Sequence, residues 1–416
     1  MRISKFGGAA LLATVAWGVA ASVAFATDIS FWTWRQEDKA VYTKLFDEFT
    51  KANPDIHVKF EALPDESYPT MVTTGLAGGK GADVIQTHAY GWLDQYVKAG
   101  YFVPLDTTSV PNLANFPADA LAALTYRGDH KVYSVPYASD TLGLFINKDV
   151  FAKAGLTPPK TWDEFIADAK AFKAKGIIPL ANGLGTDWFN EMFVSAVTDP
   201  FLGADFIKGL TTGATTFKDK TYTDALGKVL ELRDYMPPTF AGIDYDTGNQ
   251  LFLSGRAAML FGGSFDIASY RALNPKINMD FIAPPAAKAG DPAQAAIFYD
   301  GGYAVNAASP NKEAALKLVN WMGSLDFGNQ FSNDLGNVSP IKGVTITDPL
   351  LAEVAKLGTT ALPHINVVYF RYGKPTGSEI IQHDIPKLMA GSMTPEQVGA
   401  DLTEGIAKWY APFQGK

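Results

Sequence analysis

The sequence predicts an α/β fold, because strand-like and helix-like segments alternate along the first part of the chain. The alternation runs through strands at 28–34, 56–60 and 83–86 and helices at 40–53 and 68–76. In the first of these helices Val41, Leu45 and Phe49 recur on one face at helical spacing. Strands that alternate with helices about every 20 residues are typical of a mostly parallel sheet.

The same two patterns continue to the end of the chain. Buried strands are expected at 133–146, 257–261 and 299–305, and helices at 162–175, 313–323 and 394–409. Thr161 and Gly176 suit the cap positions of the helix between them. The 416 residues are enough for two or three domains at roughly 150 residues each. No Pro/Ser-rich linker divides them, which favours two lobes joined by more than one strand.

The first 26 residues read as an export signal. Arg2 and Lys5 precede an uncharged, mostly apolar stretch over 6–25, and Ala24-Phe25-Ala26 ends it with small residues. This pattern predicts a signal peptide over 1–26 that is cleaved before Thr27. The alternative is an uncleaved membrane anchor, for which the stretch is nearly long enough. No cysteine follows to carry a lipid, so we expect a free protein in the periplasm of a Gram-negative cell.

Composition and motifs argue against several classes of function. The net charge of -8 and the absence of a cluster of basic residues argue against nucleic-acid binding. The absence of cysteine excludes disulfides, thiol catalysis and Fe–S clusters. The histidines lack metal-binding spacing, residues 75–81 lack the end of a phosphate loop, and 262–266 lack the last glycine of a nucleophile elbow. We therefore predict no catalytic residue, metal or cofactor. A carboxylate pair for glycoside hydrolysis, which meets only in space, stays open.

Aromatic and polar side chains gather where the predicted strands end. In open α/β sheets ligands bind beyond the carboxyl ends of the strands. Aromatic faces together with hydroxyl-binding polar groups are the combination that binds sugars. The candidate ligand-binding residues are Trp34, Arg35, Gln36, Thr87, His88, Asp140, Asp187, Trp188, Ser264, Phe265, Asp300, Tyr369 and Arg371.

Some of these residues have a structural interpretation as well. Asp140 lies in an apolar run, and a buried carboxylate needs a partner. Arg371, between aromatic residues, is either a ligand contact or half of an ion pair, and His88 and Trp188 are either ligand contacts or structural. Of Trp32 and Trp34 one is expected in the core, with Trp34 the exposed one. The helical spacing around three other tryptophans predicts core positions for Trp92, Trp162 and Trp321.

The mature chain carries several distinctive motifs, which are Phe31-Trp-Thr-Trp34, Phe46-Asp-Glu-Phe49 with Asn53-Pro54-Asp55-Ile56, Gly81-Ala-Asp-Val-Ile-Gln86, Val135-Pro-Tyr-Ala-Ser-Asp140, Leu144-Phe-Ile-Asn147-Lys148-Asp149-Val-Phe151, Pro158-Pro-Lys-Thr161-Trp162-Asp163-Glu164 and Phe252-Leu-Ser-Gly-Arg-Ala-Ala-Met259. These motifs resemble the sugar-binding proteins of ABC importers, the maltose-binding-like family of extracellular solute-binding proteins. They occur in the family's order over essentially the whole mature chain.

The resemblance implies a two-lobed periplasmic binding protein fold of type II with a ligand cleft between the lobes. The N-terminal lobe is expected at 27–140 plus 303–340, and the C-terminal lobe at 141–302 plus 341–416. It further implies a monomer that closes on a carbohydrate and delivers it to the membrane permease subunits of an ABC importer. The alternatives are a polyol or other small polar solute, or an exported glycoside-active enzyme.

The resemblance also extends to individual residues. The loop with Trp34, Arg35 and Gln36, the pair Thr87 and His88, and the acidic Asp140 match family ligand positions. Phe265 departs from the tryptophan usual there, and an arginine at 371 is unusual. Arg35, His88 and Arg371 in one cleft would suit an anionic sugar or a glycosyl-glycerol.

Overall fold

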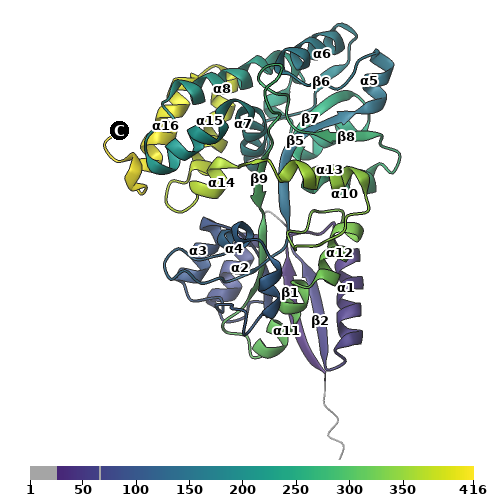
Figure 1. Cartoon of the computed structure of the whole chain (residues 1–416), viewed down its shortest axis with the longest axis vertical. Helices are drawn as coiled ribbons and strands as arrows, with labels where there is room; N and C mark the ends of the chain where they lie inside the picture. The colour runs from purple at the N-terminus through teal and green to yellow at the C-terminus, as the bar shows by residue number, and fades with distance from the viewer. Residues whose placement is uncertain (1–25, 65–66) are drawn as a thin grey trace, which may run out of the picture.

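The structure, a computed structural model, describes residues 26–64 and 67–416 and contains two separate β-sheets. Figure 1 shows one sheet below the other, each flanked by helices, with strands passing between the two levels. Within these ranges, none of the helices combines the length and the apolar character needed to cross a membrane. The predicted signal peptide lies outside the described residues.

The first sheet has the strand order β2-β1-β3-β10-β4. Its strands are β1 (Thr27–Thr33), β2 (Ile56–Ala62), β3 (Val84–His88), β4 (Val135–Pro136) and β10 (Gly301–Val305). Strand β1 runs parallel to β2 and β3, whereas β10 is antiparallel to β3 and β4. The carboxyl ends of β1 and β3 therefore lie side by side at one edge of the sheet.

Six helices of the described ranges accompany this N-terminal sheet. They are α1 (Lys39–Ala52), α2 (Tyr68–Ala77), α3 (Gly91–Lys98), α4 (Ala118–Ala123), α11 (Lys312–Met322) and α12 (Leu325–Asp334), with the short 3-10 helix η2 (Pro111–Asn115). Helix α1 buries Leu45, Phe46 and Phe49 against Phe31 of β1, as its apolar spacing predicts. This packing holds the end of β1, and so the loop after it, against the sheet.

The second sheet has the order β11-β9-β5-β7-β6, and β8 pairs with β5 beside it. Its strands are β5 (Ser139–Asn147), β6 (Ile178–Leu180), β7 (Ala257–Gly263), β8 (Met279–Ile282), β9 (Ala296–Tyr299) and β11 (Leu362–Pro363). Every residue of β5 and β7 is buried. Residues at the start of β5, Asp140 among them, are therefore removed from water by the sheet itself.

In the part of the chain that the structure describes, ten helices pack around this C-terminal sheet. They are α5 (Lys148–Ala154), α6 (Trp162–Ala174), α7 (Asp187–Thr212), α8 (Lys220–Glu231), α9 (Tyr245–Leu253), α10 (Ile267–Leu273), α13 (Pro349–Gly358), α14 (Ile365–Tyr369), α15 (Gly377–Ala390) and α16 (Pro395–Ala407), with the 3-10 turns η3 (Arg233–Tyr235), η4 (Phe240–Gly242), η5 (Ser264–Asp266) and η6 (Ala411–Phe413). Helix α6 begins at a capping box in which Thr161 accepts from the Glu164 N–H. This confirms the predicted cap at Thr161.

The chain passes between the two sheets at β4–β5 and again at β9–β10. Only Tyr137 and Ala138 separate the first pair, and only Asp300 separates the second. The long stretch after α12 leads back to α13 (Figure 1). The lobe boundaries 27–140 plus 303–340 and 141–302 plus 341–416 stay a prediction.

Candidate functional site at the junction of the two lobes

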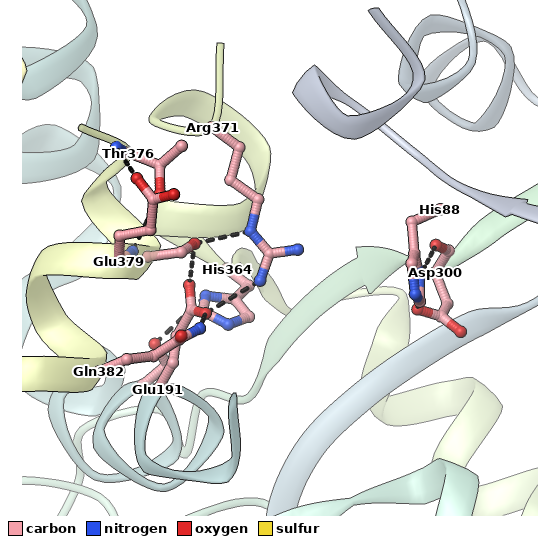
Figure 2. A network of polar contacts seen from close by, with 10 residues as sticks. His88, Glu191, Asp300, His364, Arg371, Thr376, Glu379 and Gln382 are labelled. Atoms are coloured by element: carbon pink, nitrogen blue, oxygen red, sulfur yellow. Dashed lines mark hydrogen bonds and ion pairs between the residues drawn. The ribbon is translucent and has the colours of Figure 1, made fainter. Parts of the chain in front are cut away.

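An aromatic group gathers at the carboxyl ends of β1 and β3, and we call it the Trp34 cluster (Trp34, His88, Trp92, Tyr137 and Asp300). The ring centroids of Trp34 and His88 are 4.2 Å apart, and those of His88 and Trp92 are 4.6 Å apart with an edge-on geometry. His88 Nδ1 lies 3.2 Å from Asp300 Oδ1, as Figure 2 shows, and the Tyr137 hydroxyl donates to the same carboxylate. Burial alone would raise the pKa of Asp300, but the His88 and Tyr137 contacts lower it.

The loop after β1 carries a buried cation whose charge is already compensated. The guanidinium of Arg35 pairs with the carboxylate of Asp38 and lies 3.2 Å from Glu37 Oε1. The neighbouring Gln36 is exposed, whereas Thr87, at the end of β3, is buried. Arg35 is therefore less available to an anionic ligand than its sequence position indicates.

Asp140 is the least compensated carboxylate in this region. It is 2 % exposed, and the hydroxyl of Ser264 donates to its Oδ1 at 3.5 Å. No ion pair joins it to a cation in the part of the chain that the structure describes. Burial, and then the nearby charge of Asp300, hold the pKa of Asp140 well above its usual range. Such a group gains from any donor that a ligand brings.

A second aromatic group, the Trp188 cluster (Trp188, Tyr245, Phe265 and Asp266), lies on the C-terminal lobe. Trp188 is 4.9 Å from Tyr245 and 6.2 Å from Phe265, centroid to centroid. The Tyr245 hydroxyl donates to Asp266, and burial raises the pKa of Asp266 to about 7. Asp187 is exposed at the first residue of α7. The cluster thus offers a half-buried indole beside a buried acid.

Arg371 forms a buried ion pair. Its Nη2 is 2.9 Å from Glu191 Oε2, and its Nε donates to Ser378 Oγ at 2.6 Å (Figure 2). Ser378 and Gln382 also donate to Glu191, at 2.6 and 2.9 Å. The guanidinium carbon lies 5.2 Å from the centre of the Trp92 ring across the lobe junction. Of the two interpretations of Arg371, this geometry favours the ion pair, and Tyr369 lies half-buried nearby at the end of α14.

A cavity of about 450 Å³ opens between α2, β3 and α3 on one side and residues 371–382 on the other. It is lined by Thr87, His88 and Arg371 of the predicted site, and by Trp92. Asp140, Ser264, Trp188 and Phe265 are not among its lining residues. The predicted residues therefore divide into a group that lines this cavity and a group that lies outside it.

The tryptophan predictions need correction at three places. Trp32 in β1 and Trp34 directly after it both lie half-buried and neither is core, because the buried face of β1 is taken by Ile29, Phe31 and Thr33, which alternate with them. Trp92 is half-buried at the cavity, whereas Trp162 is 3 % exposed in the core as predicted and Trp321 is only partly buried. The core position predicted for Trp92 from helical spacing is wrong, because the first turn of α3 faces the other lobe.

Tyr137, Tyr245 and Asp266 also belong to these clusters and were not predicted from the sequence. The signal for Tyr137 was its place between two strands that belong to different sheets. Asp266 follows the chosen Ser264 and Phe265 directly. In the described ranges, His, Asp and Glu form no group of three that would hold a metal ion.

Comparison with known proteins decides the family. The family model described as bacterial extracellular solute-binding protein matches residues 33–326. The chain belongs to this family. The family of this solute-binding protein is extracellular, so the chain is exported, and the resemblance drawn from its motifs is confirmed.

Named relatives of this solute-binding protein include sugar-binding proteins. A multiple sugar-binding protein of Streptococcus mutans is 26% identical over 325 residues, which cover 76% of each chain. A maltotriose-binding protein of Pyrococcus abyssi is 28% identical over 328 residues, 74% of this chain and 65% of that one.

Solved structures share the fold of this solute-binding protein. A chitin oligosaccharide binding protein superposes with a TM-score of 0.78 at 22% identity, covering 93% of this chain and 99% of that one. The GacH receptor of Streptomyces glaucescens gives 0.77 at 21% identity, covering 94% and 99%. These neighbours confirm the two-lobed binding protein fold.

Proposed function

We propose that this solute-binding protein captures a carbohydrate between its lobes and delivers it to the permease of an ABC importer. The observation that carries the proposal is the meeting of half-buried aromatic rings and incompletely paired carboxylates at the lobe junction. Trp34 and Trp188 supply the rings, and Asp140 supplies the acceptor. Relatives named for sugar and maltotriose binding support the same substrate class.

The proposed contacts follow from the chemistry of each side chain. Trp34, Trp188, Phe265 and Tyr369 stack on the C–H faces of the sugar rings. Hydroxyl groups of the sugar bond to Gln36, Thr87, His88, Asp140, Asp187, Ser264 and Asp300, while Arg35 and Arg371 act from their ion pairs on the cleft wall. Polar groups fix the orientation of the ligand and the aromatic faces bury it, which is the general design of small-molecule sites.

Lobe closure links binding to delivery. Since the Trp34 cluster and the Trp188 cluster belong to different lobes, a ligand that touches both binds the closed form more tightly than the open form. That differential affinity shifts the population toward closure. The closed monomer is then the form that the permease subunits recognise.

Export to the periplasm, with cleavage before Thr27, completes the proposal. Strand β1 begins at Thr27, which pairs with Ile56 of β2. Removal of residues 1–26 would thus leave the described sheet complete. Mass measurement of the protein from a periplasmic extract should give a chain that starts at Thr27. An unprocessed chain in the membrane pellet would contradict cleavage.

Carbohydrate binding is tested with the mature protein. A thermal-shift screen of mono- to trisaccharides, acidic sugars and polyols is followed by titration calorimetry on every hit. Each carbohydrate is then recovered after incubation with the protein and analysed by chromatography. We expect saturable binding of a carbohydrate at one site per chain, with the carbohydrate recovered intact. Binding of polyols alone, or release of hydrolysed product, would overturn the proposal in favour of the corresponding alternative.

A further inference from the structure

The cavity between the lobes extends into a part of the N-terminal lobe that the proposed contacts leave unused. Tyr68 and Val72 of α2, Gln86 of β3, and Asp94 and Tyr96 of α3 line it there. None of these five residues belongs to the predicted site. All five are nine-tenths or more buried. We call this part of the cavity the α2–α3 wall.

Two buried polar atoms on the α2–α3 wall have no hydrogen-bond partner among the described residues. Gln86 is 0 % exposed; its Oε1 accepts from Thr33 Oγ1 at 2.7 Å, but its Nε2 is unpartnered. Asp94 is 6 % exposed, and its Oδ1 is unpartnered. Buried polar groups are almost always paired in folded proteins, because an unpaired one costs free energy. One donor and one acceptor on the same wall match the hydroxyl group, which is both.

The charges around the cavity favour an uncharged occupant. Arg371 is paired with Glu191, and Lys374 with Glu379. Burial raises the pKa of Asp94 to about 6, against the lowering effect of Lys98 and Arg127. Lys98 itself is exposed to water. The wall therefore offers no buried, uncompensated cation to an anionic sugar.

Trp92, a member of the Trp34 cluster, also lines the cavity. Its ring lies edge-on to His88 at 4.6 Å, and His88 lines the same cavity. Tyr68, on the α2–α3 wall, is 5.5 Å from Trp34 between ring centroids. A ligand held at Trp34 and Asp300 would thus reach the wall with its next unit. The volume of about 450 Å³ lies within the roughly 300–1,000 Å³ usual for small-molecule sites.

We infer that the α2–α3 wall is a second sugar subsite, which takes a neutral, hydroxyl-bearing unit of an oligosaccharide whose neighbouring unit lies at the Trp34 cluster. Gln86 Nε2 donates to a hydroxyl oxygen of this unit, and Asp94 Oδ1 accepts a hydroxyl proton. Trp92 marks the passage between the two units. The inference rests on the proposed carbohydrate function and makes the protein an oligosaccharide receptor.

The test compares ligand length with variants of the wall. The probes are one-, two- and three-unit members of the α-1,4-glucose, β-1,4-xylose and β-1,4-N-acetylglucosamine series, titrated by calorimetry. The variants are Asp94→Asn, which removes the charge and turns one of the two acceptor oxygens into a donor, and Gln86→Met, which removes the donor at similar size. Asp168→Asn on α6 is the matched control, because burial raises the pKa of Asp168 to about 6 as well and it does not line the cavity.

We expect the two-unit probe of one series to bind at least about tenfold more tightly than its one-unit probe. Asp94→Asn and Gln86→Met should each weaken binding of that two-unit probe about tenfold, which one lost hydrogen bond to a charged or buried group explains. The one-unit probe should change less than twofold, and Asp168→Asn should change neither. If Gln86→Met fails to fold, as circular dichroism would show, Asp94→Asn decides alone.

Other results would overturn the subsite. Equal affinity of the parent protein for one- and two-unit probes would show that no second unit lies on the wall. Equal losses of affinity for both probes in Asp94→Asn and Gln86→Met would show the same. In either case the carbohydrate function stands. A preference for acidic probes would contradict the neutral unit. Failure of every sugar in the wider screen would remove the proposed function and the subsite together.

Discussion

The guanidinium of Arg371 lies 2.9 Å from the carboxylate of Glu191, and the two side chains are 10% and 0% exposed. The pair joins the segment between α14 and α15 to α7. Burial would raise the pKa of Glu191, but the charge of Arg371 lowers it. Because each charge compensates the other, the pair contributes a rigid wall to the cavity rather than a free cation.

Breaking this pair should destabilise the protein strongly. Arg371→Gln and Glu191→Gln each leave one buried charge without its partner, which costs about 3–5 kcal/mol. The double variant should lose less than the sum of the two single losses. Urea denaturation of all four proteins measures the free energies of unfolding.

The exposed pair Lys356 and Glu353, 3.5 Å apart, provides the control for the Arg371 cycle. Lys356→Gln should change the free energy of unfolding by at most about 1 kcal/mol. If Arg371→Gln has unchanged stability but binds carbohydrate more weakly, Arg371 is instead a ligand contact.

The elements of the fold could be predicted where the signal is local. The apolar face of α1 and the capping box at Thr161 depend on residues within a turn or two. The order of the strands in the sheet could not be predicted. Strand β10 lies between β3 and β4, although more than 160 residues separate it from β4 in the chain. That pairing depends on the whole folded lobe.

The candidate site, like the fold, could be predicted only where the signal is local. Trp34 and His88 meet because neighbouring parallel strands end at one edge, which the strand-end rule anticipates. The Glu191 partner of Arg371 is 180 residues away, and no local pattern indicates it. Trp92 was assigned to the core because spacing along a helix does not say which face meets the second lobe.

Replacing Asp140 should separate stability from binding. Asp140→Asn keeps the shape and removes a buried carboxyl group whose ionised form burial disfavours. We expect the free energy of unfolding at pH 7 to rise by on the order of 1–2 kcal/mol, and the affinity for the carbohydrate to fall about tenfold or more. Since burial raises the pKa of Asp140 in the folded state, the stability gain should grow as the pH rises above the ordinary range of aspartate.

Asp300→Asn is the contrasting variant for Asp140, because His88 and Tyr137 bond to the Asp300 carboxylate and lower its pKa. This variant should lose stability at pH 7. Denaturation and calorimetry on both variants measure the two effects, and a loss of stability in Asp140→Asn would show that its charge is paired after all.

His364 should make stability depend on pH. It is 0 % exposed, its Nδ1 lies 3.2 Å from Ser195 Oγ, and burial lowers its pKa to about 4, against the effect of Glu191. The unfolded chain therefore takes up the proton first as the pH falls below 6.5. The folded state should lose about 3 kcal/mol between pH 6.5 and 4, and nothing from this group above pH 6.5.

His364→Gln removes this titration, and the charge of Arg371 still lowers the pKa of the neighbouring Glu191. The difference in free energy of unfolding between the parent and the variant should therefore follow the curve of one histidine. A difference that stays constant from pH 4 to 7 would show that His364 is not held neutral by burial.

The aromatic platforms give the most direct test of the site. Trp34→Ala and Trp188→Ala each remove a half-buried ring at the lobe junction, and each should weaken carbohydrate binding by about 1–4 kcal/mol, as anchoring aromatic residues do. Trp321→Ala is the control, because Trp321 is also half-buried but packs on Phe49 and Phe327, away from the cavity. It should lose up to about 3–5 kcal/mol of stability and no affinity. Calorimetry at a temperature where all three variants are folded separates the two effects. Normal affinity in both Trp34→Ala and Trp188→Ala would place the ligand elsewhere, and a loss in Trp34→Ala alone would confine its stacking to the N-terminal lobe.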